Sequence, residues 1–272
     1  MQGLPGFIPT ADKIRYLKLL LEVGFDTLDF GSFVSAKAIP QMKDTHEVIA
    51  EIGSFKGNTR LLAIVANERG ALEAVRYPEI DFLGFPFSIS ETFQIRNTNS
   101  TIEVSMERLR EIFKTCQDHG KELVVYLSMA FGNPYGDPWN ADVVSAYIEK
   151  LSALGMRIFA LSDTIGVAHP DSIQYLFESL IPRWKGLEIG AHFHTTPDSW
   201  EEKIRAAWEG GCRRFDGAIR GFGGCPMAKD VLTGNMPTEK MLQFFQDQGE
   251  KLSLDWDKFD KAIELSSSIF KS

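Results

Sequence analysis

The stretches ELVVYLSMAF (122–131) and RIFALSD (157–163) indicate the fold class. Each is a short run of apolar, β-branched and aromatic residues, which predicts a buried strand. Gly155 lies just before the second run, where a glycine in the left-handed conformation would end an intervening helix. A strand, a helix and a second buried strand are typical of a parallel sheet covered by helices.

The same alternation continues through most of the chain. Amphipathic segments lie between further strand-like runs and predict crossover helices. Helix starts are expected near Thr10, Ser100 and Pro197, and helix ends near Gly24, Gly120 and Gly211. The further predicted strands are FDTLDFG (25–31), TRLLAIVAN (59–67), DFLGFPFS (81–88), LEIGAHFH (187–194) and CRRFDGAI (212–219).

Two architectures fit this pattern, a (β/α)8 barrel and an open doubly wound sheet. No GxGxxG or GxxxxGK[ST] motif is present, so the commonest signals of an open nucleotide-binding sheet are missing. Polar residues instead gather at the carboxyl ends of the predicted strands, where barrel enzymes carry their active sites. We therefore expect an α/β fold of the barrel type. These residues are Asp29, Asn67, Ser88, Ser128, Asp163, His192, His194 and Asp216.

Seven strands are readable, whereas a barrel needs eight. The first helix, expected over 10–23, has no strand before it. Because no low-complexity segment or linker divides the chain, we expect a single domain over 1–272 with a helical tail at about 238–271.

Composition excludes several classes of protein. The 272 residues carry a net charge of -8, which disfavours a nucleic-acid partner. Three scattered cysteines without a CxxC pair form neither a disulfide framework nor a zinc ribbon. No apolar run approaches the roughly 18 residues of a membrane span, and no signal peptide is visible. We expect a cytoplasmic protein without a membrane partner.

His192 and His194 stand two residues apart on a predicted strand and should point to the same side. Two neutral imidazoles at such positions can bind one divalent cation. They could equally be two hydrogen-bonded histidines at a solvent-facing strand end. The spacing alone leaves both interpretations open.

A glycine-rich segment, GFGGCPMAKDVLTGNMPTE (221–239), follows the last predicted strand. Its glycines allow the backbone to approach a ligand closely. Cys225 in this loop could exchange a proton or act as a nucleophile. Cys116, in an amphipathic helix, is instead expected to be a small buried apolar residue.

Five motifs in this order resemble the 3-hydroxy-3-methylglutaryl-CoA (HMG-CoA) lyases, which belong to the metal-dependent barrel lyases called DRE-TIM metallolyases. The resemblance extends from Gln2 to about Glu239. The motifs are GSFVSAKAIPQMKDT (31–45), SDTIG (162–166), AHFH (191–194), GFGGCP (221–226) and GNMPTE (234–239).

The resemblance implies a set of site residues. His192, His194 and Asn235 take the places of metal ligands, and Mg²⁺ or Mn²⁺ is the implied metal. Cys225, Asp29, Asp163 and His192 take the places of catalytic residues. The implied small-molecule substrate is an acyl-CoA, and a homodimer is a further expectation.

Three features depart from the family pattern. Asp29 stands where members usually have Glu, and Thr195 follows the histidines where many have Asp. Members also begin with a strand that ends Arg-Asp-Gly-x-Gln, whose Asp binds the metal and whose Arg stabilises the enolate. Gln2 matches the last residue of that motif, so we expect Met1 to be an internal methionine and the Arg and Asp to lie upstream. For the chain as written, weak metal binding is expected.

The implied reaction is the retro-Claisen cleavage of HMG-CoA to acetyl-CoA and acetoacetate. Two alternatives stay open. The enzyme could act on a related 3-hydroxyacyl-CoA or a 2-oxo acid, including in the synthase direction, or the chain could be a non-catalytic barrel remnant that binds a CoA ester or a protein.

Overall fold

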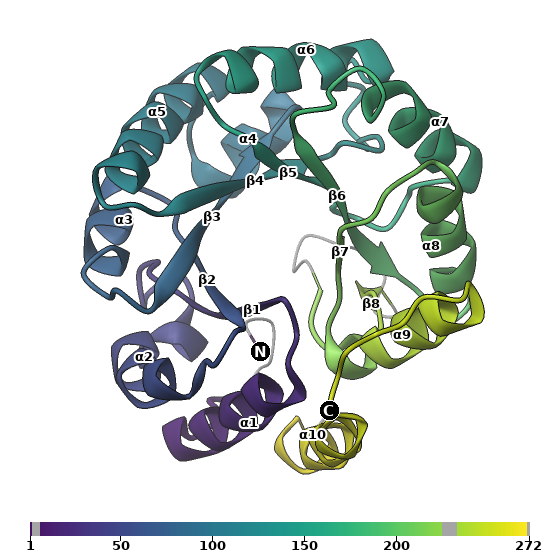
Figure 1. Cartoon of the computed structure of the whole chain (residues 1–272). Helices are drawn as coiled ribbons and strands as arrows, with labels where there is room; N and C mark the ends of the chain where they lie inside the picture. The colour runs from purple at the N-terminus through teal and green to yellow at the C-terminus, as the bar shows by residue number, and fades with distance from the viewer. Residues whose placement is uncertain (2–5, 225–232, 271–272) are drawn as a thin grey trace. The chain divides into compact units, whose positions relative to one another are not determined.

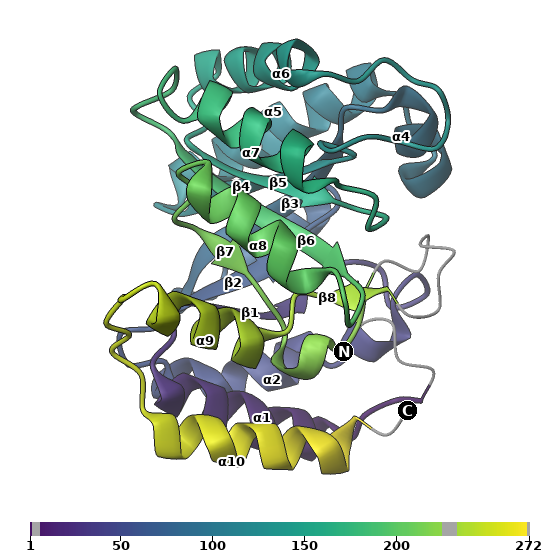
Figure 2. The same cartoon turned by 90° about the vertical axis from the view of Figure 1, so that its right-hand side faces the viewer.

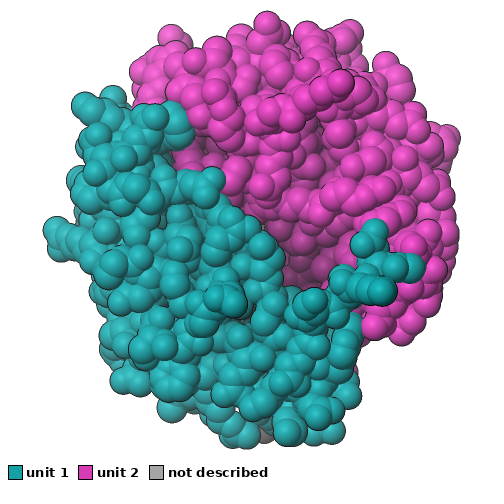
Figure 3. Space-filling model, in the orientation of Figure 1, with its two compact units in different colours: residues 1–84, 111–122, 249–272 teal, residues 85–110, 123–248 magenta. Residues whose placement is uncertain are grey.

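The computed structural model describes residue 1 and residues 6–224 and 233–270. The chain divides into two compact units, coloured separately in Figure 3. The first comprises residues 1–84, 111–122 and 249–272, and the second comprises residues 85–110 and 123–248. The expectation of a single domain over 1–272 stays a prediction.

Three parallel strands form the sheet of the first unit. They are β1 (Thr27–Ser32), β2 (Arg60–Ile64) and β3 (Ile80–Ser88), and β3 continues past Gly84 into the second unit. β2 pairs with both neighbours and places Leu61, Leu62 and Ala63 in the core. The strands expected at 25–31, 59–67 and 81–88 are confirmed, with ends that differ by up to three residues.

The first unit's helices begin with α1 (Thr10–Val23), which lies along α10 (Trp256–Ile269) in both views (Figures 1 and 2). α1 has the bounds predicted from the sequence and ends at Gly24, whose φ of 86° is left-handed. Lys13 of α1 reaches Asp44 with its Nζ 2.8 Å from Oδ1, and both side chains are buried. The other helical elements are η1 (Pro40–Met42), α2 (Thr45–Ile52), η2 (Gly53–Phe55), α3 (Glu68–Ala74) and the end of α5 (Ile102–Asp118).

The second unit is built on four parallel strands, β4 (Glu122–Ser128), β5 (Ile158–Asp163), β6 (Glu188–Thr195) and β7 (Phe215–Asp216). β5 is buried along its whole length because strands pair with both of its edges and helices cover its outer face. α6 (Ala141–Ala153), α7 (Pro170–Leu180) and α8 (Trp200–Glu209) lie outside β4 to β6 (Figure 1). The other helical elements here are α4 (Glu91–Thr98), the start of α5, η3 (Ile219–Gly221) and α9 (Thr238–Asp247).

Two features at the end of this sheet differ from the sequence expectation. β7 has only two residues, whereas a strand over 212–219 is predicted; after it Ala218 makes an isolated bridge to Pro237, and η3 begins at Ile219. β8 (Gly234–Asn235) is not predicted and pairs antiparallel with the end of β6. A Gly-Asn pair has no strand propensity of its own, so only the neighbouring strand makes it one.

The predicted tail at 238–271 is observed as α9 and α10 with a short connection between them. Within the described part of the chain, no helix is long and apolar enough to cross a membrane.

Candidate metal site at the end of strand β6

His192 and His194 of β6 lie on the same side of the strand, as their spacing predicts. Their ring centroids are 5.5 Å apart and the rings meet edge to face. Tyr126 of β4 contacts His192 from the side, with the ring centroids 5.3 Å apart. His194 is buried, whereas the His192 side chain is 31% exposed. The pair therefore forms a half-buried imidazole cluster rather than two solvated histidines.

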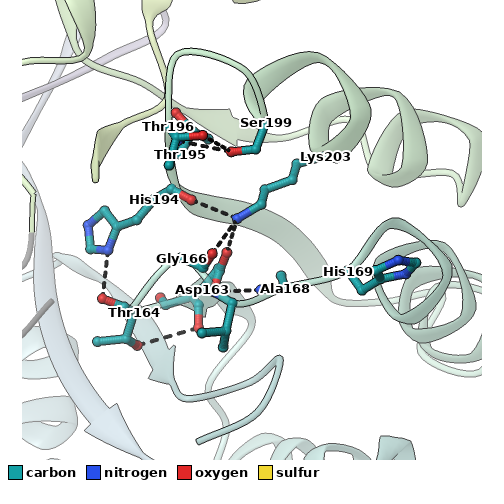
Figure 4. Close-up of polar contacts among 12 residues, drawn as sticks. Asp163, Thr164, Gly166, Ala168, His169, His194, Thr195, Thr196, Ser199 and Lys203 are labelled. Atoms are coloured by element: carbon teal, nitrogen blue, oxygen red, sulfur yellow. Dashed lines mark hydrogen bonds and ion pairs between the residues drawn. The ribbon is translucent and has the colours of Figure 1, made fainter. Parts of the chain in front are cut away.

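A hydrogen bond fixes the tautomer of His194. Its Nδ1 lies 2.7 Å from the carbonyl oxygen of Thr164, just after β5 (Figure 4). Since a carbonyl oxygen only accepts, Nδ1 must carry the proton, and in the neutral ring the lone pair is on Nε2. Burial, with smaller contributions from His192 and Lys203, lowers the pKa of His194 to about 4. At neutral pH the ring is thus uncharged and can offer Nε2 to a cation.

His192 has a carboxylate partner in Asp216. The register of β6 and β7 places these two residues opposite each other, and Nδ1 of His192 lies 3.2 Å from Oδ2 of Asp216. Burial alone would raise the pKa of Asp216, but the hydrogen bond and charge of His192, together with Arg214, lower it below its ordinary value. A carboxylate on Nδ1 orients the ring and points the lone pair of a neutral imidazole to Nε2.

Asn235 reaches the cluster through β8, where it pairs with His194. Its Nδ2 donates to the carbonyl oxygen of Phe222 at 2.8 Å, which leaves the amide oxygen as the atom suited to a cation. Two glycines of the GFGG segment allow this approach: a Cβ at Gly223 would lie 2.9 Å from Nδ2 of Asn235, and one at Gly221 would lie 2.9 Å from its main-chain oxygen.

Asp163 lies on the other face of the sheet. It pairs with Phe193, and side chains alternate along a strand, so its carboxylate points away from both imidazoles. There it meets Lys203 of α8, with Oδ2 2.7 Å from Nζ (Figure 4). Burial raises the pKa of Asp163, while Lys203 and the N–H groups of Ala168 and Val167 oppose that rise. The structure does not bring Asp163 among the predicted ligands, and its catalytic role stays a prediction.

Two further residues, Asp29 and Cys225, are predicted to be catalytic. Asp29 belongs to β1 in the first unit, where its side chain is exposed beside a bulge in the pairing with β2. Cys225 lies outside the described residues, so its role stays a prediction. Cys116 is buried, and burial raises the pKa of its thiol to about 12, which agrees with the inert role expected for it.

His192, His194 and Asn235 are therefore the predicted site residues that the structure brings together. Among the residues described, no group of three or more His, Cys, Asp or Glu side chains could hold a metal ion. Two imidazole nitrogens and one amide oxygen nevertheless suit a divalent cation, and each side chain is held by a hydrogen bond from its other polar atom.

Sequence reasoning missed the two residues that complete these contacts. The sequence indicates Asp216 only as a polar residue at a predicted strand end. Lys203 lies in an amphipathic helix, and nothing in a single sequence distinguishes it from a surface lysine.

Solved structures of HMG-CoA lyases resemble this chain along its whole length. The enzyme from Brucella melitensis superposes with a TM-score of 0.91 at 30% identity, covering 100% of this chain and 95% of that one. An HMG-CoA lyase from Acinetobacter baumannii, solved with coenzyme A and 3-methylmalate, superposes with a TM-score of 0.90 at 29% identity, covering 99% and 87%. These likenesses confirm an α/β fold of the barrel type.

Sequence comparison agrees with the structural comparison. The chain is 31% identical to the hydroxymethylglutaryl-CoA lyase YngG of Bacillus subtilis over 97% of its own length and 87% of that protein. The family model described as HMGL-like matches residues 1–265. The motifs, the fold and the paired histidines of β6 thus lead to one assignment: the chain belongs to the HMGL-like family of lyases.

Proposed function

We propose that this lyase cleaves HMG-CoA into acetyl-CoA and acetoacetate with the help of Mg²⁺ or Mn²⁺. Relatives about 30% identical over nearly the whole chain are named hydroxymethylglutaryl-CoA lyases, which supports this substrate and a cleavage reaction. Coenzyme A in the Acinetobacter baumannii structure supports an acyl-CoA as the substrate. A homodimer and a cytoplasmic location, both expected from the sequence, stay predictions.

The observation that carries this proposal is the arrangement of His192, His194 and Asn235. Hydrogen bonds at both Nδ1 atoms direct the lone pairs of the neutral rings to Nε2, and the amide nitrogen of Asn235 is already engaged by Phe222. These three side chains would hold the metal. When bound, a divalent cation would polarise the oxygens of the substrate and ease removal of its hydroxyl proton.

The chain's own residues have two proton transfers to perform. A base takes the hydroxyl proton of the substrate while the bond between C2 and C3 breaks, which turns the hydroxyl carbon into the ketone of acetoacetate. The electron pair of that bond becomes the enolate of acetyl-CoA, and an acid returns a proton to its carbon.

We assign the first transfer to His192 or Asp29 and the second to Cys225. His192 can take this role only while its Nε2 is not bound to the metal, and the carboxylate of Asp216 then keeps its ring oriented. Asp29 offers an exposed carboxylate on β1. Cys225 is assigned from its motif alone.

The test measures acetoacetate released from HMG-CoA with Mg²⁺, Mn²⁺ or EDTA. It uses residues 1–272 and also any longer product of the same reading frame. His194→Ala should abolish Mn²⁺ binding and cleavage together. His169→Ala is the matched control, since it removes an imidazole whose side chain is 74% exposed.

Three outcomes separate the alternatives. Cleavage that persists in EDTA would contradict the metal dependence. Cleavage of another 3-hydroxyacyl-CoA in preference to HMG-CoA would redirect the substrate assignment. Binding of CoA esters without turnover in either form of the protein would identify a non-catalytic remnant.

A further inference from the structure

Lys203 is a lysine of helix α8 buried behind the histidine strand. Only 2% of its side chain is exposed. Its partner Asp163 has only 1% of its side chain exposed. Its Nζ donates to Oδ2 of Asp163 at 2.7 Å and to the main-chain oxygens of Gly166 and His194 at 3.0 Å each. The ammonium group thus joins the end of β6 to the loop that follows β5.

Asp163 continues this connection on the loop side. Its Oδ1 accepts hydrogen bonds from the main-chain N–H groups of Val167 at 2.9 Å and Ala168 at 3.1 Å. The loop over 163–168 is therefore held at both ends by one carboxylate and its ammonium partner, as Figure 4 shows. We call Lys203 and Asp163 together the buried clamp.

The buried clamp holds the two ends of the contact that fixes His194. The imidazole donates from Nδ1 to the carbonyl oxygen of Thr164, which follows Asp163 directly. Lys203 binds the carbonyl oxygen of His194 itself. An increase in the separation of β6 from this loop would therefore move the ring and its acceptor apart.

Stabilisation of the folded state does not by itself explain why this Lys–Asp pair is buried. Removing two charges from water is costly, and a protein with well-packed apolar residues of similar volume in place of a buried ion pair is often as stable. Lys203 instead binds two main-chain oxygens that matter for the imidazole. One belongs to His194 itself, and the other belongs to Gly166, in the loop that carries the acceptor of the His194 ring.

We propose that Lys203, acting with Asp163, is a positioning residue for the His194 imidazole. It keeps the carbonyl oxygen of Thr164 in line with Nδ1, so that the lone pair of Nε2 faces the metal site. In this proposal Asp163 holds Lys203 in place and does not touch the reacting atoms. It rests on the proposed function only for the metal, since the orientation of the ring can be measured without one.

The test is the double variant Lys203→Met with Asp163→Asn, which removes both charges together and leaves none buried and unpaired. Lys13→Met with Asp44→Asn is the matched control, because it removes another buried Lys–Asp pair, with Nζ 2.8 Å from Oδ1, in the first unit. Each variant removes one buried ion pair, but only the first should disturb His194.

Two measurements separate positioning from a general structural role. In the metal-free protein, ¹H–¹⁵N NMR of the histidine rings should show His194 with its proton on Nδ1 in the wild type and in the control. The variant of the buried clamp should show a mixture of both tautomers. Titration with Mn²⁺ should give a Kd about 10- to 100-fold higher than that of the control.

The outcomes are distinct. A folded clamp variant that keeps the Nδ1–H signal and the control's Mn²⁺ affinity overturns the proposal. If that variant loses only turnover, Asp163 has a direct catalytic role instead.

If the double variant does not fold, Lys203→Arg decides, because the larger head group shifts the donors in a buried slot. An exchange rate of the Nδ1 proton that rises at least about tenfold supports positioning, and an unchanged rate rejects it.

Failure of the proposed function would look different. A wild-type protein that does not bind Mn²⁺ would contradict the metal site, while the NMR comparison would still decide whether the buried clamp orients His194.

Discussion

Acidification of the metal-free protein should destabilise it through His194. In the folded chain burial lowers the pKa of this imidazole from 6.5 to about 4, whereas in the unfolded chain it keeps its ordinary value. Between these two values the unfolded state binds a proton that the folded state does not. The free energy of unfolding therefore falls as the pH drops from about 6.5 to about 4, and the loss amounts to roughly 3 kcal/mol.

Equilibrium unfolding in urea, followed by tryptophan fluorescence at a series of pH values in EDTA, measures this effect. Carboxylates titrate in every variant, so the informative quantity is the difference between the wild type and His194→Gln. The wild type should lose roughly 3 kcal/mol more than the variant between pH 7 and pH 4. His169→Gln controls for the removal of an exposed imidazole, because 74% of that side chain is accessible.

Coincident pH dependences for the wild type and His194→Gln would refute this reasoning. They would mean that the ring is charged in the folded state or that its pKa does not change on folding. A titration of the His194 ring by NMR decides between these causes, since a midpoint near 6.5 would show that burial does not suppress its protonation.

Three further predictions concern other parts of the chain. Asp216→Asn should raise the Kd for Mn²⁺ about 10- to 100-fold, measured by titration, because it removes the carboxylate that orients His192; an unchanged Kd would mean that this contact does not tune the ligand. Cys116 and Cys212 should not react with a thiol reagent until the protein unfolds, because burial raises the pKa of each to about 12; mass spectrometry of the labelled peptides checks this, and labelling under native conditions would contradict their placement. Phe159→Ala should lower the free energy of unfolding by about 3 to 5 kcal/mol in urea, because the side chain is fully buried on β5; a loss below about 1 kcal/mol would show that the site is not packed.

The fold was predictable where one physical signal dominates. Buried parallel strands are continuous apolar runs, so β5 and β6 were found from composition and length alone. The glycines at 24, 120, 155 and 211 have the positive φ expected after a helix. β8 could not be found in this way, because Gly234 and Asn235 form a strand only by pairing with β6.

The sequence predicts those features of the site that depend on residues close together in the chain. The two-residue period of a strand requires that His192 and His194 share a side, and the structure confirms it. Asn235 lies some forty residues further along the chain and was reached only through the resemblance of its motif. The partners of these residues could not be predicted, since the contacts of Asp216 and Lys203 depend on strand register and helix placement rather than on local sequence.

The three predicted metal ligands carry no negative charge, and the carboxylates near them are engaged by other side chains. Thr195, which stands where many members have Asp, donates from its hydroxyl group to the main-chain oxygen of Asn235 at 3.2 Å and so supports the strand that carries the third ligand. The carboxylate of Asp216 serves His192, and that of Asp163 meets the ammonium group of Lys203. His192, His194 and Asn235 themselves carry no negative charge when the rings are neutral. We infer that a cation held by these three side chains would keep most of its positive charge, so the negatively charged carboxylate of an HMG-CoA substrate would itself strengthen metal binding.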